Sequence, residues 1–121
     1  GQDEAHVREN RALYREKFER LVPMLEPVLD VRQPDAGFYL WAAVPNGNGN
    51  GAAGDDIAFA RGLLAQYNVT VLPGSLLARE AHGANPGRGR IRMALVAQTA
   101  ECLEAAQRIV HYTQRLQGRT P

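Results

Sequence analysis

The chain has 121 residues, of which 45% are hydrophobic and 22% charged, and its formal net charge is +1. These values are typical of one globular domain and exclude a disordered or collagen-like chain. Lys17 is the only lysine, and the arginines alternate with acids instead of forming a basic block, so a nucleic-acid partner is not expected.

The compartment is predicted from segments that the sequence lacks. No apolar run approaches the ~20 residues of a membrane-spanning helix, so a membrane partner is not expected. The first residues are polar and acidic, unlike a signal peptide, which favours a cytoplasmic protein. Cys102 is the single cysteine, so it has no disulfide partner within the chain, and we expect a buried, inert thiol.

The first half of the chain predicts a helix, a hairpin and a loop. Apolar residues spaced by three and four predict an amphipathic helix from about residue 4 to 21 or 25, which Pro23 should end or kink. Because no capping sequence precedes it, we expect preceding chain to lead into this helix. Strands at 28–31 and 38–44 should follow, joined by a turn at 33–37, and the second is apolar enough for both faces to be covered. A Gly- and Asn-rich loop occupies 46–54.

The second half predicts two helices and two strands. Asp55 or Asp56 should cap a helix that ends at Tyr67, with Asn68 in the left-handed conformation. Strands are expected at 69–72 and 89–96, separated by a loop with a short helical turn, which Ser75 should cap. Thr99 should cap the last helix, which Gly118 ends. The expected buried stripes are Ile57, Ala60, Leu63, Leu64 and Tyr67 in the first helix and Leu103, Ala106, Ile109, Val110, Thr113 and Leu116 in the second.

This order of elements predicts the fold class. Hairpins and short connections favour a small, mostly antiparallel sheet with helices packed on it, which is an α+β fold. We expect a single domain over residues 1–121.

Several motifs resemble binding or catalytic sites, but the residues around them do not support those functions. Residues 49–54 match a dinucleotide fingerprint, but no acid follows about 20 residues later to bind the ribose. No lysine completes a phosphate-binding loop. The histidines have no metal-ligand spacing with one another or with the cysteine, so no metal site is predicted, and no serine–histidine–aspartate set follows from spacing. The aromatic residues of the second strand lack the basic neighbours of an RNA-binding sheet, which favours core packing. The residues weighed here are His6, His82 and His111 for metal, Ser75 as nucleophile, and Phe38, Tyr39 and Trp41 for RNA.

Arg92 is the strongest candidate for a functional residue. Its neighbours from Ile91 to Val96 are apolar, so it is an arginine in a strand that otherwise looks like core. A buried guanidinium is costly unless an anion meets it. That anion is either an acid of this chain or a ligand carboxylate, and the residues alone leave both alternatives open.

Three segments together resemble a known family. They are Gly37–Trp41, Val69–Ser75 and Gly89–Leu95, and they resemble the C-terminal third of class I/II, fold-type I aminotransferases. The resemblance covers essentially the whole chain in the same order. It implies the small C-terminal domain of such an enzyme, with pyridoxal phosphate as the cofactor of the full-length protein. It also implies an amino-acid or 2-oxo-acid substrate, the large domain of the same enzyme as partner, and a homodimer.

Residues 72–83, followed by Asn85–Gly87, are most similar to bacterial N-succinyldiaminopimelate aminotransferases. This similarity implies transamination between glutamate and N-succinyl-2-amino-6-oxopimelate in lysine biosynthesis. Leu77 is a departure, since relatives often carry phenylalanine there, and it leaves the packing on the substrate side open.

Within this resemblance only Arg92 matches a functional residue, the arginine that binds the α-carboxylate of the substrate. The catalytic and cofactor-binding residues belong to the large domain, and Lys17 has no context that matches the cofactor lysine. We therefore expect the chain alone neither to bind pyridoxal phosphate covalently nor to transaminate. Two other hypotheses remain: a ligand-binding regulatory domain of ferredoxin-like build, and a structural domain with Arg92 in an internal ion pair.

Overall fold

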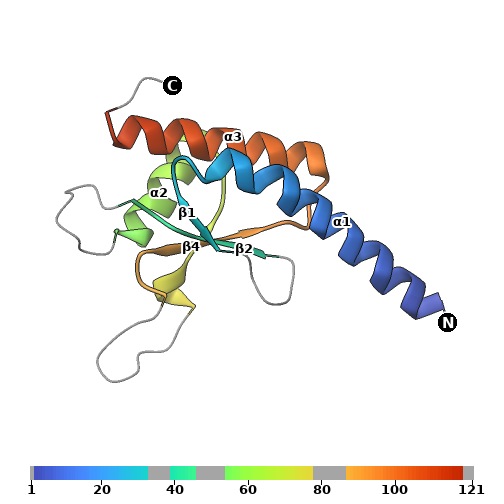
Figure 1. The fold of residues 1–121 in the computed structure, drawn as a ribbon. Coiled ribbons are helices and arrows are strands. Elements are labelled where there is room, and N and C mark those ends of the chain that lie inside the picture. Colours follow the sequence, from blue (N-terminus) through green and yellow to red (C-terminus); the bar gives the residue numbers. More distant parts are fainter. Residues whose placement is uncertain (1, 33–38, 46–53, 78–86, 119–121) are drawn as a thin grey trace.

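A computed structural model describes residues 2–32, 39–45, 54–77 and 87–118 of the chain. In the described part of the chain, helices pack on a small sheet (Figure 1). The elements are α1 (Gln2–Leu25), β1 (Asp30–Arg32), β2 (Tyr39–Ala43), α2 (Asp56–Tyr67), β3 (Leu72–Pro73), the short 3-10 helix η1 (Gly74–Leu76), β4 (Arg90–Ala94) and α3 (Thr99–Leu116).

The four strands form one sheet in the order β1-β2-β4-β3, and every pair is antiparallel. Helices α1 and α3 pack against each other and lie together over one face of this sheet (Figure 1). The predicted α+β fold with a mostly antiparallel sheet is therefore confirmed. None of the helices in the described part of the chain is long and apolar enough to cross a membrane.

The core lies between the sheet and the helices. Side chains alternate between the two faces of a strand. Leu40 and Ala42 of β2 and Ile91 and Met93 of β4 are buried on the helix side. Helices α1 and α3 contribute the buried Leu21, Leu25, Ala106 and Ile109 to the same cluster.

The opposite face of the sheet is more open. Tyr39, Trp41 and Ala43 of β2 are half-buried, and Arg90 and Ala94 of β4 are exposed. The prediction that both faces of the second strand are covered is therefore wrong for the described part of the chain. The alternation leaves one face available for contact with something else.

Helix α2 is built as its sequence predicts. The side chain of Asp55 caps it by accepting from the amide of Ala58 at 2.9 Å, and Asn68 ends it with a φ of 56°. Its buried stripe differs from the prediction, because Phe59 is buried and Leu64 is about half exposed. In α3 the buried residues are Cys102, Ala106, Ile109, Tyr112 and Thr113, while the predicted Leu116 is exposed.

Other predicted boundaries agree only in part. Helix α1 ends at Leu25, the later of the two predicted ends, and Pro23 does not end it. A proline in the last turn lacks only its amide hydrogen, and the carbonyl that this amide would bond, on Glu19, belongs to an exposed residue. Val28 and Leu29 are buried in a turn, so β1 begins at Asp30. The predicted turn at 33–37, most of the loop at 46–54 and His82 lie outside the described residues, as does Phe38.

The predicted strand at 69–72 is reduced to Leu72–Pro73. Val69 and Val71 are buried and Thr70 is exposed, so the alternation is right, but these residues do not join the ladder of β4. Alternating β-branched residues fit a half-buried surface whether or not a neighbouring strand is in bonding distance. Thr99 is the first residue of α3, and Gln98 precedes it as the N-cap without a side-chain bond.

Candidate functional site

The open face of the sheet places Arg92 at its centre. In the register of the strands Trp41 of β2 and Leu72 of β3 lie opposite Arg92, one on each side. Residues directly opposite one another in an antiparallel sheet share a face. Tyr39 lies on the same face, two residues from Trp41. Arg92 therefore emerges between two aromatic rings and an exposed leucine.

The guanidinium of Arg92 is stacked on these rings. Its Cζ lies 4.0 Å from the ring centroid of Tyr39 and 5.9 Å from that of Trp41. Such cation–π contacts stabilise by about 0.5–2 kcal/mol, depending on how far water is excluded. They also limit the freedom of a long side chain, so the rings hold the guanidinium in one orientation. The aromatic residues predicted as core packing thus flank the candidate site.

Arg92 has no anion bound to it in the described residues. The ion pairs found there, Arg32 with Asp30 and Arg108 with Glu104, do not include it. Its Nε is buried and makes no hydrogen bond. A buried donor without an acceptor is unfavourable. The internal ion pair that the sequence left open therefore has no support in this part of the chain.

The carboxylate of Asp56, predicted only as a possible helix cap, holds the loops beside the site. Asp56 is buried; its Oδ1 accepts from the Ser75 hydroxyl at 2.8 Å and from the Gly89 amide at 3.1 Å. Its Oδ2 accepts from the Ser75 amide at 2.9 Å. Asp56 therefore ties the start of α2 to η1 and to the residue before β4. The sequence predicted that Ser75 caps the short helical turn. Instead, η1 has no side-chain cap, and the Ser75 hydroxyl donates to the Asp56 carboxylate.

The close contact between η1 and the start of β4 explains the glycine of the Pro73-Gly74 pair. A Cβ placed on Gly74 would overlap the carbonyl oxygen of Gly87 and would press on that of Arg90. Only a residue without a side chain lets the two backbones approach this closely. Together with Asp56, this contact fixes where the strand that carries Arg92 begins.

The ionisation of Asp56 predicts an acid-sensitive stability. Burial on its own would raise its pKa, but the hydrogen bonds from Ser75 and Gly89 outweigh burial and hold the pKa below the ordinary value of 3.8. A carboxyl whose pKa is lowered by folding stabilises the protein above its unfolded-state pKa, and this stabilisation is lost as the pH falls through the folded-state pKa. We expect Asp56→Asn to lower the free energy of unfolding at pH 7 by about 1–3 kcal/mol, because an amide cannot accept from all three donors. Denaturant unfolding measures this difference.

The matched control is Asp30→Asn. Asp30 is exposed on β1, and the same charge change there should alter stability by less than about 0.5 kcal/mol. The difference between Asp56→Asn and the unsubstituted chain should shrink below pH 4, where the unsubstituted carboxyl also takes up its proton. A difference that stays constant from pH 7 to pH 3 would contradict the assignment.

Lys17 links the first helix to the end of β4. It is only 7% exposed, and its Nζ donates to the carbonyl oxygens of Leu95 at 2.7 Å and Ala97 at 2.5 Å. The ammonium also lies 5.1 Å from the ring centroid of Tyr14. This role was not predicted from the sequence. A signal was present, since position 17 is three residues after Tyr14 and four before Leu21, on the apolar stripe of the helix.

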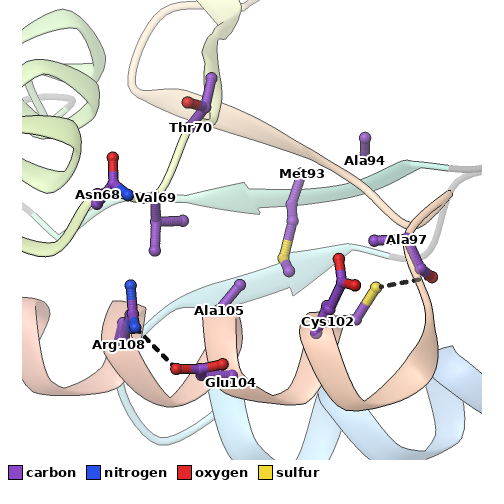
Figure 2. A pocket seen from close by; sticks show the side chains of 11 residues that line it. Asn68, Val69, Thr70, Met93, Ala94, Ala97, Cys102, Glu104, Ala105 and Arg108 are labelled. Atoms are coloured by element: carbon purple, nitrogen blue, oxygen red, sulfur yellow. Dashed lines mark hydrogen bonds and ion pairs between the residues drawn. The ribbon is translucent and has the colours of Figure 1, made fainter.

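A separate pocket of about 340 Å³ lies on the helix side of the sheet, between α3, the end of β4 and residues 68–70 (Figure 2). Met93 and Cys102 line it, and Arg108 lies near one end. Arg108 is already bonded, to Glu104 at 2.7 Å and to the carbonyl oxygen of Tyr67 at 2.9 Å. Because Arg92 leaves the other face of the sheet, this pocket is not part of its site.

Cys102 and His111 add no reactive group to the site. Cys102 is buried as predicted, and its Sγ donates to the Ala97 carbonyl at 3.5 Å. Burial raises the pKa of this thiol, which keeps it protonated and unreactive. His111 lies half-buried on α3. The described residues include no group of three His, Cys, Asp or Glu side chains placed to hold a metal ion.

An α+β fold of this kind is found in aminotransferases, and comparison with known proteins gives the family of the chain. The sequence model for "Aminotransferase class I and II" matches residues 1–109, so the chain belongs to this family. Members of this family depend on pyridoxal phosphate.

Solved structures and a curated protein show which members are similar. An aminotransferase from Neisseria meningitidis Z2491 is 51% identical, with a TM-score of 0.75 over 87% of this chain and 25% of the other. A probable N-succinyldiaminopimelate aminotransferase from Thermus thermophilus is 35% identical, with a TM-score of 0.62 over 83% of this chain and 24% of that one. An LL-diaminopimelate aminotransferase from Nitratidesulfovibrio vulgaris (strain DSM 19637 / Miyazaki F) is 33% identical over 86% of this chain and 24% of its own length. The chain thus spans about a quarter of the length of these relatives.

The single lysine of this chain does not fit the covalent site that pyridoxal phosphate needs. The cofactor is held in such enzymes by a lysine that forms a covalent bond with it. Lys17 is the only lysine, and its Nζ is buried and bound to two backbone carbonyls. It is therefore not available as the cofactor lysine, and no step of cofactor chemistry is assigned to this chain.

Proposed function

We propose that this chain is the C-terminal small domain of a longer, pyridoxal phosphate-dependent aminotransferase and that Arg92 binds the α-carboxylate of its amino-acid substrate. The observation that carries the proposal is the guanidinium of Arg92, which is stacked on Tyr39 and Trp41 and has no acid bound among the described residues. Membership of the family and the match to about a quarter of each relative's length support it. In this proposal the enzyme acts in the cytoplasm as a homodimer, and the cofactor lies in the larger part.

The geometry of Arg92 suits the recognition of a carboxylate. A guanidinium presents parallel N–H groups that bond both oxygens of a carboxylate at once, and it keeps its charge at any physiological pH. Two such bonds fix the position and the rotation of the substrate, so the bond at its α-carbon that must break is held in one orientation. The rings of Tyr39 and Trp41 keep the guanidinium aimed and exclude water from one side of it. The cofactor, when bound to the full-length enzyme, supplies the chemistry of amino-group transfer.

The proposed substrate is N-succinyl-L,L-diaminopimelate, with 2-oxoglutarate as the amino acceptor. The Thermus thermophilus protein is called a probable N-succinyldiaminopimelate aminotransferase, and the Nitratidesulfovibrio vulgaris protein an LL-diaminopimelate aminotransferase. Both names share the diaminopimelate skeleton. The succinyl group of the substrate is proposed because residues 72–83 resemble those of N-succinyldiaminopimelate aminotransferases.

The first experiment compares this chain with the longer protein that contains it. With added pyridoxal phosphate, the longer protein should show the absorbance of a covalently bound cofactor and should transfer an amino group from glutamate. The 121-residue chain should do neither, because Lys17 is engaged. The proposal would be overturned if the short chain kept the absorbance of bound cofactor after dialysis. It would also be overturned if the full-length protein had no transaminase activity.

The second experiment tests the substrate. The amino acceptor 2-oxoglutarate is supplied with N-succinyl-L,L-diaminopimelate, with free L,L-diaminopimelate, or with alanine as a monocarboxylic control. The proposal expects the largest kcat/KM for the succinylated substrate. A preference for free diaminopimelate would replace the succinylated substrate and leave the aminotransferase assignment standing.

A further inference from the structure

A second arginine emerges from the same face of the sheet as Arg92. Arg90 is two residues earlier in β4, and alternate residues of a strand point to the same side. Their Cα atoms are therefore about 6.5–7 Å apart, from a rise of 3.2–3.4 Å per residue. Arg90 is exposed, and the residue opposite it in β2 is the small Ala43, whereas Arg92 lies opposite Trp41. The side chain of Arg90 is thus left uncovered beside the arginine of the proposed site.

Among the described residues, the charges on this face leave both guanidiniums without a carboxylate partner. Asp30 lies in the same row as Arg90, on the far side of Ala43, but it is paired with Arg32 at 3.4 Å. Neither Arg90 nor Arg92 takes part in an ion pair within the described residues. Two neighbouring cations without counterions create a positive potential that attracts an anion with two charges.

The backbone at Arg90 is held firmly. Its amide donates to the carbonyl of Gly87 at 3.2 Å, and the amide of Val44 donates to the carbonyl of Gly89 at 2.8 Å. Asp56 accepts from the Gly89 amide, directly before Arg90. The base of the Arg90 side chain therefore has a fixed position relative to Arg92. A fixed spacing between two binding groups favours ligands of matching length.

We propose that Arg90 binds a second carboxylate of the substrate, at the far end of its side chain, while Arg92 binds the α-carboxylate. The pair selects amino acids that carry two carboxylates over those with a neutral side chain. This inference rests on the proposed function, because it takes Arg92 as the α-carboxylate site. Arg90 is then a residue that determines specificity and takes no part in the transfer of the amino group.

The test uses Arg90→Met in the full-length holoenzyme and compares two donors of nearly the same shape, glutamate and glutamine. Single-turnover measurement of the amino-donor half-reaction gives kcat/KM for both, including the slower one. We expect the value for glutamate to fall about 10- to 100-fold, the loss of a hydrogen-bonded charge pair, and that for glutamine to change less than about twofold. Arg90→Lys keeps the charge and loses the parallel N–H donors of the guanidinium, so its kcat/KM for glutamate should lie between those of the unsubstituted enzyme and Arg90→Met.

Arg32→Met is the matched control. It removes the same charge from the same face, but from an arginine that already has an acid partner, so the ratio between the two donors should stay as it is. Cofactor absorbance and circular dichroism verify that each variant is folded. If Arg90→Met fails to fold, the same comparison is made in two other ways. One is the kcat/KM of Arg90→Lys for the two donors, and the other is the inhibition of the unsubstituted enzyme by glutarate compared with that by the neutral amide of glutarate.

The outcomes separate the two proposals. Equal losses for glutamate and glutamine, or no loss for either, would overturn the role of Arg90 while Arg92 keeps its own. If Arg92→Met leaves both donors unaffected, the proposed function itself fails.

Discussion

Replacing Arg92 by methionine in the full-length enzyme is expected to lower kcat/KM about 10²- to 10⁴-fold for every amino donor, because two charge-assisted hydrogen bonds to the α-carboxylate are lost, each contributing about 1.5–3 kcal/mol. The same change should leave the stability of the domain almost unaltered. No acid among the described residues is left without its partner. The stacking on Tyr39 and Trp41 contributes about 0.5–2 kcal/mol, and removing the buried, unbonded Nε offsets part of it.

Two measurements check this result, enzyme kinetics on the full-length protein and denaturant unfolding of the chain. Arg92→Lys is the informative control, since it keeps the positive charge and loses the two parallel hydrogen bonds to the carboxylate. Its activity should therefore lie between those of the unsubstituted enzyme and Arg92→Met. A loss of more than about 3 kcal/mol of stability, with activity reduced only in proportion to unfolding, would indicate a buried ion pair and would remove the carboxylate site.

Replacing Lys17 by methionine is expected to have the largest effect on stability. The long apolar side chain of methionine fills a similar space, but the carbonyls of Leu95 and Ala97 lose their donor. A buried polar group left without a partner costs about 1–3 kcal/mol, so the free energy of unfolding should fall by about 2–5 kcal/mol. That is a large share of the roughly 5–15 kcal/mol that stabilises a typical domain.

Arg20→Met provides the comparison on the same helix, because Arg20 is exposed and the charge change is identical. Its effect should stay within about 0.5 kcal/mol. Equal unfolding free energies for the two variants would show that the carbonyls find water instead, and that Lys17 does not link α1 to β4. The chain itself is sufficient for this measurement, since no cofactor is involved.

The sequence was a good guide where one local rule decided the structure. The order of helices and strands, a cap by Asp55 or Asp56, the left-handed Asn68 and the α+β fold were all predicted correctly, since each follows from spacing or from the preference of a single residue. The family was also predicted, from three motifs that occur together. Arg92 was singled out because a charged residue interrupts an apolar strand.

Other features depended on contacts between distant parts of the chain. Asp56 bonds residues 19 and 33 positions away, and Lys17 bonds residues about 80 positions away, so neither role follows from local sequence. Val69 and Val71 have strand-like preferences, but the ladder with β4 includes only the two residues after them. Tyr39 and Trp41 were assigned to the core because their hydrophobicity can be read from the sequence. Their contact with the guanidinium of Arg92 depends on the pairing of β2 with β4, which the sequence does not show.

The two edge strands carry a consequence for association. β1 has three residues, two of them charged, and β3 has two, one of which is a proline without an amide hydrogen. Short, charged or proline-containing edges give an incoming strand little backbone with which to pair. Extension of the sheet by a foreign strand is therefore opposed at both of its sides, which protects the domain against edge-to-edge aggregation.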